Sequence, residues 1–532
     1  MTWPVIAAAL GTIASLGYLV NGNIRYEVGV VRVSGYSAAE TFTHRPIVFR
    51  LLSAAQSWLP ELASSQAGPA GSWTRVWVFE AGFRLVAAGL AAAAASLLWL
   101  GLRRRTGSMA WAYALAVYAA LVFTAPATGE PDWMAALLAV AAVGAGLTMR
   151  PGFGGAIAGV LLALAALVKI STAPMAAAAL LILWAIDHRR GWIATLATAT
   201  AGLLGVGLIG WLAPFEIGWL LDIRALQPDP WTWENATAAG HYLMNLAARW
   251  PVVTLLPAYF VGVRRGEGRT ACAGLVLTAL GVVYQGQYFI YHGIGVAVLS
   301  AVLAVRTVAR SRAGLRWPLL VLSVWTLVLF VLPAAWRVEH WIALYLVTGC
   351  WAFGLAAGQW LALRRPATRS EAASTVWAAG LVLVSMLATQ TPVSAESLTL
   401  KAAGRTSWAE GVALRGELEH AEQIHRLVGA DTRVAYLAFG DTSYLLGNPT
   451  RCRYPSALFL QRDGADRLVS AATRAESLGC LTDPEARWLV WDRNWLHRKG
   501  APDDLLATID ENWACESAAV VGGYTLCPRR TG

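Results

Sequence analysis

Long apolar runs dominate residues 1–391, and short polar or charged segments separate them. Most last about 16–24 residues, close to the roughly 20 that a membrane-spanning helix needs. The pattern predicts about thirteen spans, good to about one or two because 251–263 is short and 154–186 is almost continuous. The predicted spans are 3–20, 81–101, 109–125, 133–148, 154–170, 172–186, 192–212, 251–263, 271–289, 291–305, 317–334, 340–362 and 373–391. The first lacks a basic start and a clear cleavage site, so we expect a retained span and no signal peptide.

The pattern changes after residue 391. Apolar positions follow helical spacing over 407–429, and the segments 433–439 and 487–491 read as strands. We therefore predict an all-α polytopic membrane region, residues 1–391. A small C-terminal extracytoplasmic α/β domain, residues 392–532, follows it.

Composition agrees with this division. The chain is 57% hydrophobic and only 14% charged, with a formal net charge of +10, whereas ordinary soluble domains are about a quarter charged. Residues 391–532 hold 16 Lys/Arg and 18 Asp/Glu, a net charge of −2, so residues 1–390 carry +12. These values exclude a soluble enzyme, a disordered chain and a fibrous protein.

The positive charge has a topological meaning. One alternating set of loops holds 16 arginines against three acids, whereas the other set, with nearby span ends, holds ten bases against eleven acids. Basic loops stay in the cytoplasm, so nucleic-acid binding is not needed to explain the charge. We expect an integral plasma (inner) membrane protein with a cytoplasmic N-terminus and, after an odd number of spans, an extracytoplasmic C-terminal domain.

Cysteine placement supports the same topology. Cys452, Cys480, Cys515 and Cys527 all fall in the final domain, and four cysteines in a small extracytoplasmic domain suggest two disulfides. Of three pairings we favour Cys515 with Cys527, across the last hairpin, and Cys452 with Cys480. Free thiols in a reducing compartment are the alternative.

Candidate chemistry begins in the long first outer loop. It carries Glu27, Glu40, His44 and Arg45, and the stretch 46–60 then has the amphipathic pattern of a helix lying in the membrane interface. Charges that persist at a membrane face usually meet a cavity or a partner. For Glu27, a solvated loop charge is the plainer alternative.

Further polar residues mark the outer ends of later spans. Glu130 and Asp132 lie at the mouth of the span from 133, where simple helix capping is the alternative. Lys169 is the only lysine in the first 390 residues; it is placed to meet a phosphate, or only to snorkel to the interface.

A last outer turn at 284–292 gathers Gln285, Tyr291 and His292, which suit a sugar or phosphate, or a purely structural hydrogen-bonded cluster. No His, Cys and Asp set has metal-ligand spacing, so no cofactor is predicted with certainty. A divalent metal between the carboxylates stays open.

At these residues the chain resembles the GT-C fold integral membrane glycosyltransferases, which use polyprenyl-phosphate-linked sugar donors. Four features carry the likeness: the aromatic-x-x-Arg-Pro element at 42–46, the short acidic loop at 130–132, Lys169 at a span end, and the Gln…Tyr-His turn at 285–292. Many members have Asp directly after the first span, where this chain has asparagines. Glu27 is the nearest substitute.

The resemblance implies a bacterial cell-envelope transferase. Glu27, or Glu40, would be the general base for an acceptor hydroxyl. Glu130 and Asp132 would orient the acceptor or base, and Lys169 with His292 or Arg45 would hold the departing phosphate. The partners implied are the sugar donor, a glycan, lipid or protein acceptor and membrane lipid, and attack opposite the leaving group would invert the anomeric centre.

Two other classes fit the sequence less well. A lipid or glycan transporter (flippase) would commonly show internal repeats and midplane charges, whereas here the polar residues gather at one face. A non-catalytic envelope-assembly protein would have dispensable acids.

Overall fold

The computed structural model describes most of the chain, as helices with one small sheet. The described residues are 45–68, 72–107, 109–123, 128–225, 232–286, 288, 290–310, 336, 339–363, 407–438, 442–451, 471–493, 497–498 and 501–530. They form two compact units, drawn from Arg84–Gly205 with Asp229–Gly411, and from Asn23–Phe83 with Val206–Pro228 and Val412–Gly532. Each unit is described by itself below.

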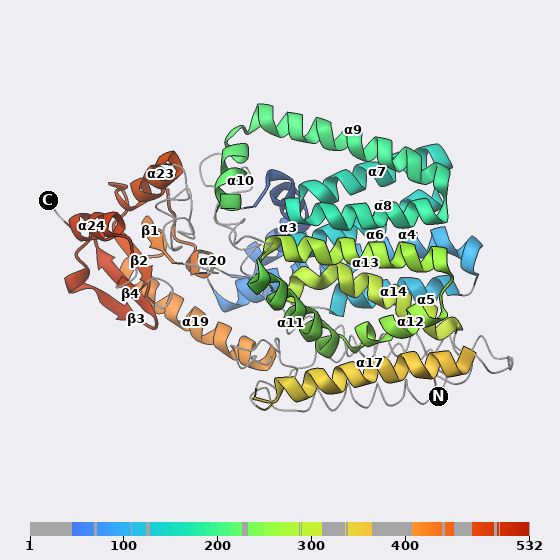
Figure 1. Ribbon diagram of the computed structural model, residues 1–532. Coiled ribbons are helices and arrows are strands. Elements are labelled where there is room, and N and C mark those ends of the chain that lie inside the picture. Colours follow the sequence, from blue (N-terminus) through green and yellow to red (C-terminus); the bar gives the residue numbers. More distant parts are fainter. Residues whose placement is uncertain are drawn as a thin grey trace. The chain divides into compact units, whose positions relative to one another are not determined.

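The first unit is a bundle of apolar helices. Two of its helices are shared with the other unit: α4 (Trp73–Thr106) begins there and α9 (His188–Leu212) ends there. The remaining elements are α5 (Met109–Phe123), α6 (Pro131–Thr148), α7 (Pro151–Leu167), η1 (Ile170–Thr172), α8 (Ala173–Ile186), α11 (Trp233–Arg249), η2 (Pro251–Leu255), α12 (Leu256–Gly262), α13 (Arg265–Gln285), η3 (Ile290–Gly293), α14 (Ile294–Arg310) and α17 (Trp341–Leu363). Figure 1 shows α6, α7, α8, α13 and α14 running alongside one another, and α6 packs against both α7 and α8.

Sequence composition explains where these helices begin and end. Proline at the first position starts α6 and α7, where the missing N–H costs no hydrogen bond. Three arginines close α4, where cations interact favourably with the helix C-terminus. Each predicted span that falls on described residues overlaps a helix, although 251–263 is divided between η2 and α12 and 271–289 extends beyond the end of α13. The spans at 3–20, 317–334 and 373–391 lie outside the described residues.

Among the described residues, five helices are both long and apolar enough to cross a membrane, and four shorter apolar helices accompany them. These helices neither confirm nor exclude the predicted total of thirteen membrane spans. The apolar helices nevertheless make the chain an integral membrane protein, as its composition predicts.

The second unit contains the four-stranded sheet, in the order β1-β2-β4-β3. The strands are β1 (Val434–Leu437), β2 (Trp488–Asp492), β3 (Ala519–Val521) and β4 (Tyr524–Pro528). β1 is parallel to β2, whereas β4 is antiparallel to both β2 and β3. The two strands predicted from sequence are thus confirmed as β1 and β2.

Helices cover both faces of this sheet, as alternating side chains require. The helix α19 (Ser407–Val428) packs Ile424 against Tyr436 and Val490 on one face. On the other face, α23 (Ala471–Leu481) and α24 (Asp503–Asn512) enclose Leu489 and Trp491. Figure 1 shows α19 and α24 flanking the strands.

The predicted disulfide between Cys515 and Cys527 is present, with a Cα–Cα distance of 4.6 Å, and it ties the segment before β3 to β4. Cys480 is also disulfide-bonded. Its predicted partner, Cys452, lies outside the described residues.

The second unit also includes α3 (Ile47–Ser65), α10 (Phe215–Ala225) and α20 (Thr442–Leu446). The helix α3 confirms the predicted amphipathic stretch, but its apolar side chains face outward and its polar side chains face inward, the reverse of a helix in a soluble protein. Leu51, Trp58 and Leu62 are exposed, whereas Arg50 and Ser53 are completely buried. An apolar outer face is the pattern expected of a helix that lies against lipid.

Candidate functional site

Four polar side chains from separate helix ends meet in the first unit. Lys169 Nζ lies 3.1 Å from Asp132 Oδ2 and donates to Gln285 Oε1 at 2.5 Å. Gln285 Nε2 donates to Asp132 Oδ1 at 3.3 Å, and His292 Nε2 lies 4.0 Å from Asp132 Oδ2. We call Asp132, Lys169, Gln285 and His292 the Asp132 cluster.

The start of α6 places Asp132. Gly129 adopts φ 89°, a left-handed conformation that favours glycine, and Pro131 then fixes the first helical residue. Trp133 is fully buried, and its indole N–H donates to the Leu121 carbonyl at 2.7 Å, which anchors α6 on α5. A carboxylate in this first turn also gains from the helix N-terminus.

A tight connection between α7 and α8 places Lys169. The hydroxyl of Thr172 donates to the carbonyls of Ala165 and Lys169, both at 2.6 Å, which ties η1 to the end of α7. Lys169 itself is extended, and its side chain points inward to Asp132 and Gln285. The snorkelling alternative, with the ammonium in the headgroups, is therefore not what the structure shows.

Close packing of α13 on η1 places Gln285. A Cβ on Gly281 would lie only 2.6 Å from the carbonyl oxygen of Ser171, so only glycine allows this approach. Gln285 lies one turn further along α13 and also donates to the Gly281 carbonyl at 3.2 Å. Gly286, with φ 60°, then ends the helix.

The short helix η3 places His292 and Tyr291. His292 is buried, and the Tyr291 ring meets it edge-on with centroids 4.5 Å apart. Gly293 permits this turn to pack on α11, since a Cβ there would lie 2.7 Å from the Tyr242 hydroxyl. The predicted Gln…Tyr-His turn therefore contributes two members of the cluster.

The electrostatics of the cluster favour a fixed ammonium. The Asp132 side chain is 3% exposed and that of Lys169 is 17% exposed. A buried charge needs an opposite charge and hydrogen bonds, and Asp132 and Gln285 supply both to Lys169. The arrangement can therefore present a rigid cation, while Asp132 is held in an ion pair.

Glu130 occupies the N-cap position of α6, but its side chain makes no capping hydrogen bond. The acid is buried at the start of the helix, where a negative charge is favourable even without such a hydrogen bond.

The second unit has its own buried ion pair, which the sequence did not single out. Arg50 Nη2 donates to Glu216 Oε1 at 2.5 Å, and the two side chains are 0% and 1% exposed. Glu216 Oε2 also accepts from the Ile47 amide, and Arg50 Nη1 donates to the Arg45 carbonyl at 2.5 Å. The pair thus fixes the Arg45-Pro46 turn at the start of α3.

Other predicted site residues cannot be placed. Glu27, Glu40 and His44 lie outside the described residues. Within the described part of the chain, no group of three or more His, Cys, Asp or Glu side chains is arranged to hold a metal ion.

Sequence comparison gives no family for the chain: no protein-family model matches it, and no curated protein matches it. A solved structure does match. The crystal structure of ArnT from Cupriavidus metallidurans in the apo state superposes with a TM-score of 0.56 over 98% of both chains, at 11% identity. At that identity the match shows the fold, so the chain has the ArnT-like, GT-C fold that its sequence predicts.

Proposed function

We propose that the protein is a membrane glycosyltransferase that takes a sugar from a polyprenyl-phosphate carrier and transfers it to an envelope acceptor at the extracytoplasmic face. The observation that carries this proposal is the Asp132 cluster, a buried cation-bearing site within an ArnT-like fold. ArnT itself is a GT-C family transferase of aminoarabinose from undecaprenyl phosphate.

The proposed reaction needs little bond-making chemistry from the protein. An acceptor hydroxyl oxygen attacks the anomeric carbon, the bond from that carbon to the phosphate oxygen breaks, and the electron pair leaves with the polyprenyl phosphate. A carboxylate takes the hydroxyl proton, and we assign this role to Glu27 or Glu40. Attack from the face opposite the phosphate inverts the anomeric centre.

Lys169 has the chemistry to stabilise the leaving phosphate. A preorganised cation in a water-poor site interacts strongly with charge that develops during the reaction. Asp132 and Gln285 hold the ammonium in place, so we assign Asp132 to positioning Lys169 rather than to proton transfer. His292 or Arg45 is the further phosphate contact, and Glu130 orients the acceptor or the base.

A transfer assay tests this proposal. Purified protein in liposomes is given a polyprenyl-phosphate sugar and an envelope extract as acceptor, and released polyprenyl phosphate is measured. We expect replacement of the general base, by Glu27→Gln or Glu40→Gln, to lower the rate by about 10²–10⁴-fold, the usual range for a general base. Glu130→Gln and Asp132→Asn should lower it as well. Asp187→Asn, a carboxylate paired with Arg105 outside the cluster, is the matched control and should keep full activity.

Three outcomes distinguish the candidate functions. If Glu27→Gln, Glu130→Gln and Asp132→Asn all fold normally and keep full transfer, the catalytic assignment is wrong. If the wild-type protein transfers no sugar but moves lipid between leaflets, it is a flippase. If it does neither, an assembly role is favoured.

A further inference from the structure

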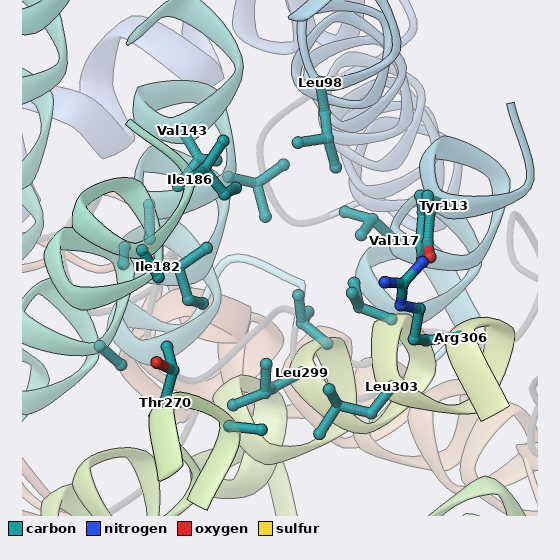
Figure 2. A pocket seen from close by; sticks show the side chains of 18 of the residues that line it. Leu98, Tyr113, Val117, Val143, Ile182, Ile186, Thr270, Leu299, Leu303 and Arg306 are labelled. Atoms are coloured by element: carbon teal, nitrogen blue, oxygen red, sulfur yellow. The ribbon is translucent and has the colours of Figure 1, made fainter. Parts of the chain in front are cut away.

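The helical unit contains a partly open apolar cavity of about 750 Å³, within the range of pockets that bind small organic ligands. Its walls come from α4, α5, α6, α8, α12, α13 and α14. Figure 2 shows Leu98, Val117, Val143, Ile182 and Leu299 pointing into the same space. None of the four members of the Asp132 cluster lines it.

Small side chains create this space. The wall includes Ala136, Ala139, Ala178, Ala179 and Gly295. In membrane proteins such residues normally let helices pack closely; here they also leave an apolar space between the helices that no side chain fills. An unfilled apolar space forfeits the dispersion contacts of its whole lining, and water does not replace them in an apolar cavity. Hydrocarbon is the filling that suits this wall.

One end of the cavity is charged and accessible. Arg105, Arg306 and Glu267 line it there, with side chains 41%, 37% and 33% exposed. Figure 2 shows the Arg306 guanidinium beside the Tyr113 hydroxyl at the cavity's edge. Lining residues at the other end, such as Ala136 and Thr278, are buried. A ligand therefore meets solvent-exposed polar groups only at the arginine end.

This end lies far from the Asp132 cluster. Glu267 and Gln285 belong to the same helix and are 285 − 267 = 18 residues apart, which at 1.5 Å per residue is about 27 Å. A phosphate bound by Arg105 and Arg306 is therefore out of reach of Lys169. The ligand of this end is not a donor in position to react.

We propose that the cavity binds an anionic glycerophospholipid as a resident, non-substrate lipid, with one hydrocarbon chain in the cavity and its phosphate at Arg105 and Arg306. Hydrogen bonds to Ile186 and Asp187 use two of the five N–H donors of Arg105, and Arg306 donates its Nε–H to Glu267 at 3.0 Å. Each guanidinium therefore retains N–H donors for a phosphate. Basic pockets between helices at the cytoplasmic side of membrane proteins bind anionic headgroups. The surrounding loops are the arginine-rich ones predicted to face the cytoplasm.

Native mass spectrometry of the purified full-length protein tests both halves of the site. The protein is delipidated and offered phosphatidylglycerol, phosphatidylcholine or polyprenyl phosphate. We expect the wild type to retain one phosphatidylglycerol, about tenfold (about 1.4 kcal/mol) in preference to phosphatidylcholine. Both lipids carry the same phosphate, but the choline cation cancels its charge and would lie beside the two arginines. Because sugar transfer is not measured, the result does not depend on the proposed function.

Matched substitutions locate the lipid. Arg105→Gln with Arg306→Gln should remove the preference for phosphatidylglycerol, while Arg103→Gln, an exposed arginine outside the lining, should preserve it. Ala179→Phe should lower retention of phosphatidylglycerol about tenfold by filling the cavity. Ala177→Phe on the same helix, which does not line the cavity, should leave retention unchanged.

Two results would overturn the proposal. One is unchanged phosphatidylglycerol retention in both the double arginine variant and Ala179→Phe. The other is retention of polyprenyl phosphate in preference to phosphatidylglycerol, because the cavity would then hold a donor tail. If Ala179→Phe does not fold, the arginine variants alone decide, since both arginine side chains are partly exposed.

Discussion

The ion pair between Lys169 and Asp132 predicts a separation of stability from activity. Lys169→Met leaves the Asp132 carboxylate, 3% exposed, without its cation. Removing one partner of a buried pair costs about 3–5 kcal/mol, and the donor from Gln285 at 3.3 Å places this case near the lower limit, about 3 kcal/mol. Asp132→Asn should cost less, about 1–2 kcal/mol, because the ammonium is 17% exposed and reaches water.

The double variant Asp132→Asn with Lys169→Met removes both charges, so it leaves no uncompensated ion. We expect its loss to be smaller than the sum of the single losses, with a coupling energy of at least about 1 kcal/mol. The assay is unfolding in mixed micelles, followed by tryptophan fluorescence. Sugar transfer should be lowered in all three variants, because the cation proposed to bind the phosphate is missing or misplaced.

The two readouts refute different parts of the reasoning. Losses that add to within about 0.5 kcal/mol would show that the two charges do not interact. Transfer that returns in the double variant would show that Lys169 only neutralises Asp132 and has no role at the phosphate.

Other predictions follow from single features. Glu216→Gln should cost about 3 kcal/mol by leaving Arg50 buried without an anion, measured by the same unfolding assay. Cys515→Ser should lower the stability of the sheet domain by about 3 kcal/mol, the value for a loop of this length; unchanged exchange of β4 amides would contradict this. Partial burial raises the pKa of Asp504, but the hydrogen bonds from Arg474 and the positive charge of Arg474 lower it, and the net shift is downward. That contribution to stability is present above about pH 4 and is lost as pH falls through the lowered pKa. Hydrogen exchange of α24 should therefore rise below pH 4 in the wild type but much less in Arg474→Gln.

The sequence predicted the members of the site better than their relationships. Asp132, Lys169, Gln285 and His292 were each recognised because a polar residue at a span end is conspicuous among apolar ones. The contacts between these residues could not be predicted. Lys169 and Gln285 are 116 residues apart in the sequence, and no local sequence pattern encodes a contact over such a separation. The sequence placed Lys169 to meet a phosphate or to snorkel to the interface, whereas in the structure its ammonium pairs with the Asp132 carboxylate. This pairing changes the role proposed for Asp132.

Buried polar residues were the harder case. In α3 the period of apolar residues correctly indicated an amphipathic helix, but in a membrane protein the apolar face can be the outer one. Arg50 was not among the predicted site residues, and it is buried against Glu216. A sequence signal did exist, since Glu216 is a lone acid directly after an apolar span, but only the fold identifies its partner.

The cavity was not predictable for a related reason. A run of alanines is as consistent with close packing of helices as with an internal cavity between them. Which of the two occurs is decided by residues on several helices together.

Mass spectrometry of envelope glycans tests the central claim most directly, using a strain that lacks the gene and is complemented with wild-type protein or Lys169→Met. The proposed transferase predicts that one sugar residue disappears from a glycan or lipid in the deletion strain. That residue should return with the wild type and stay absent with Lys169→Met at equal protein level. Identical glycan spectra in all strains, or full restoration by Lys169→Met, would contradict the account.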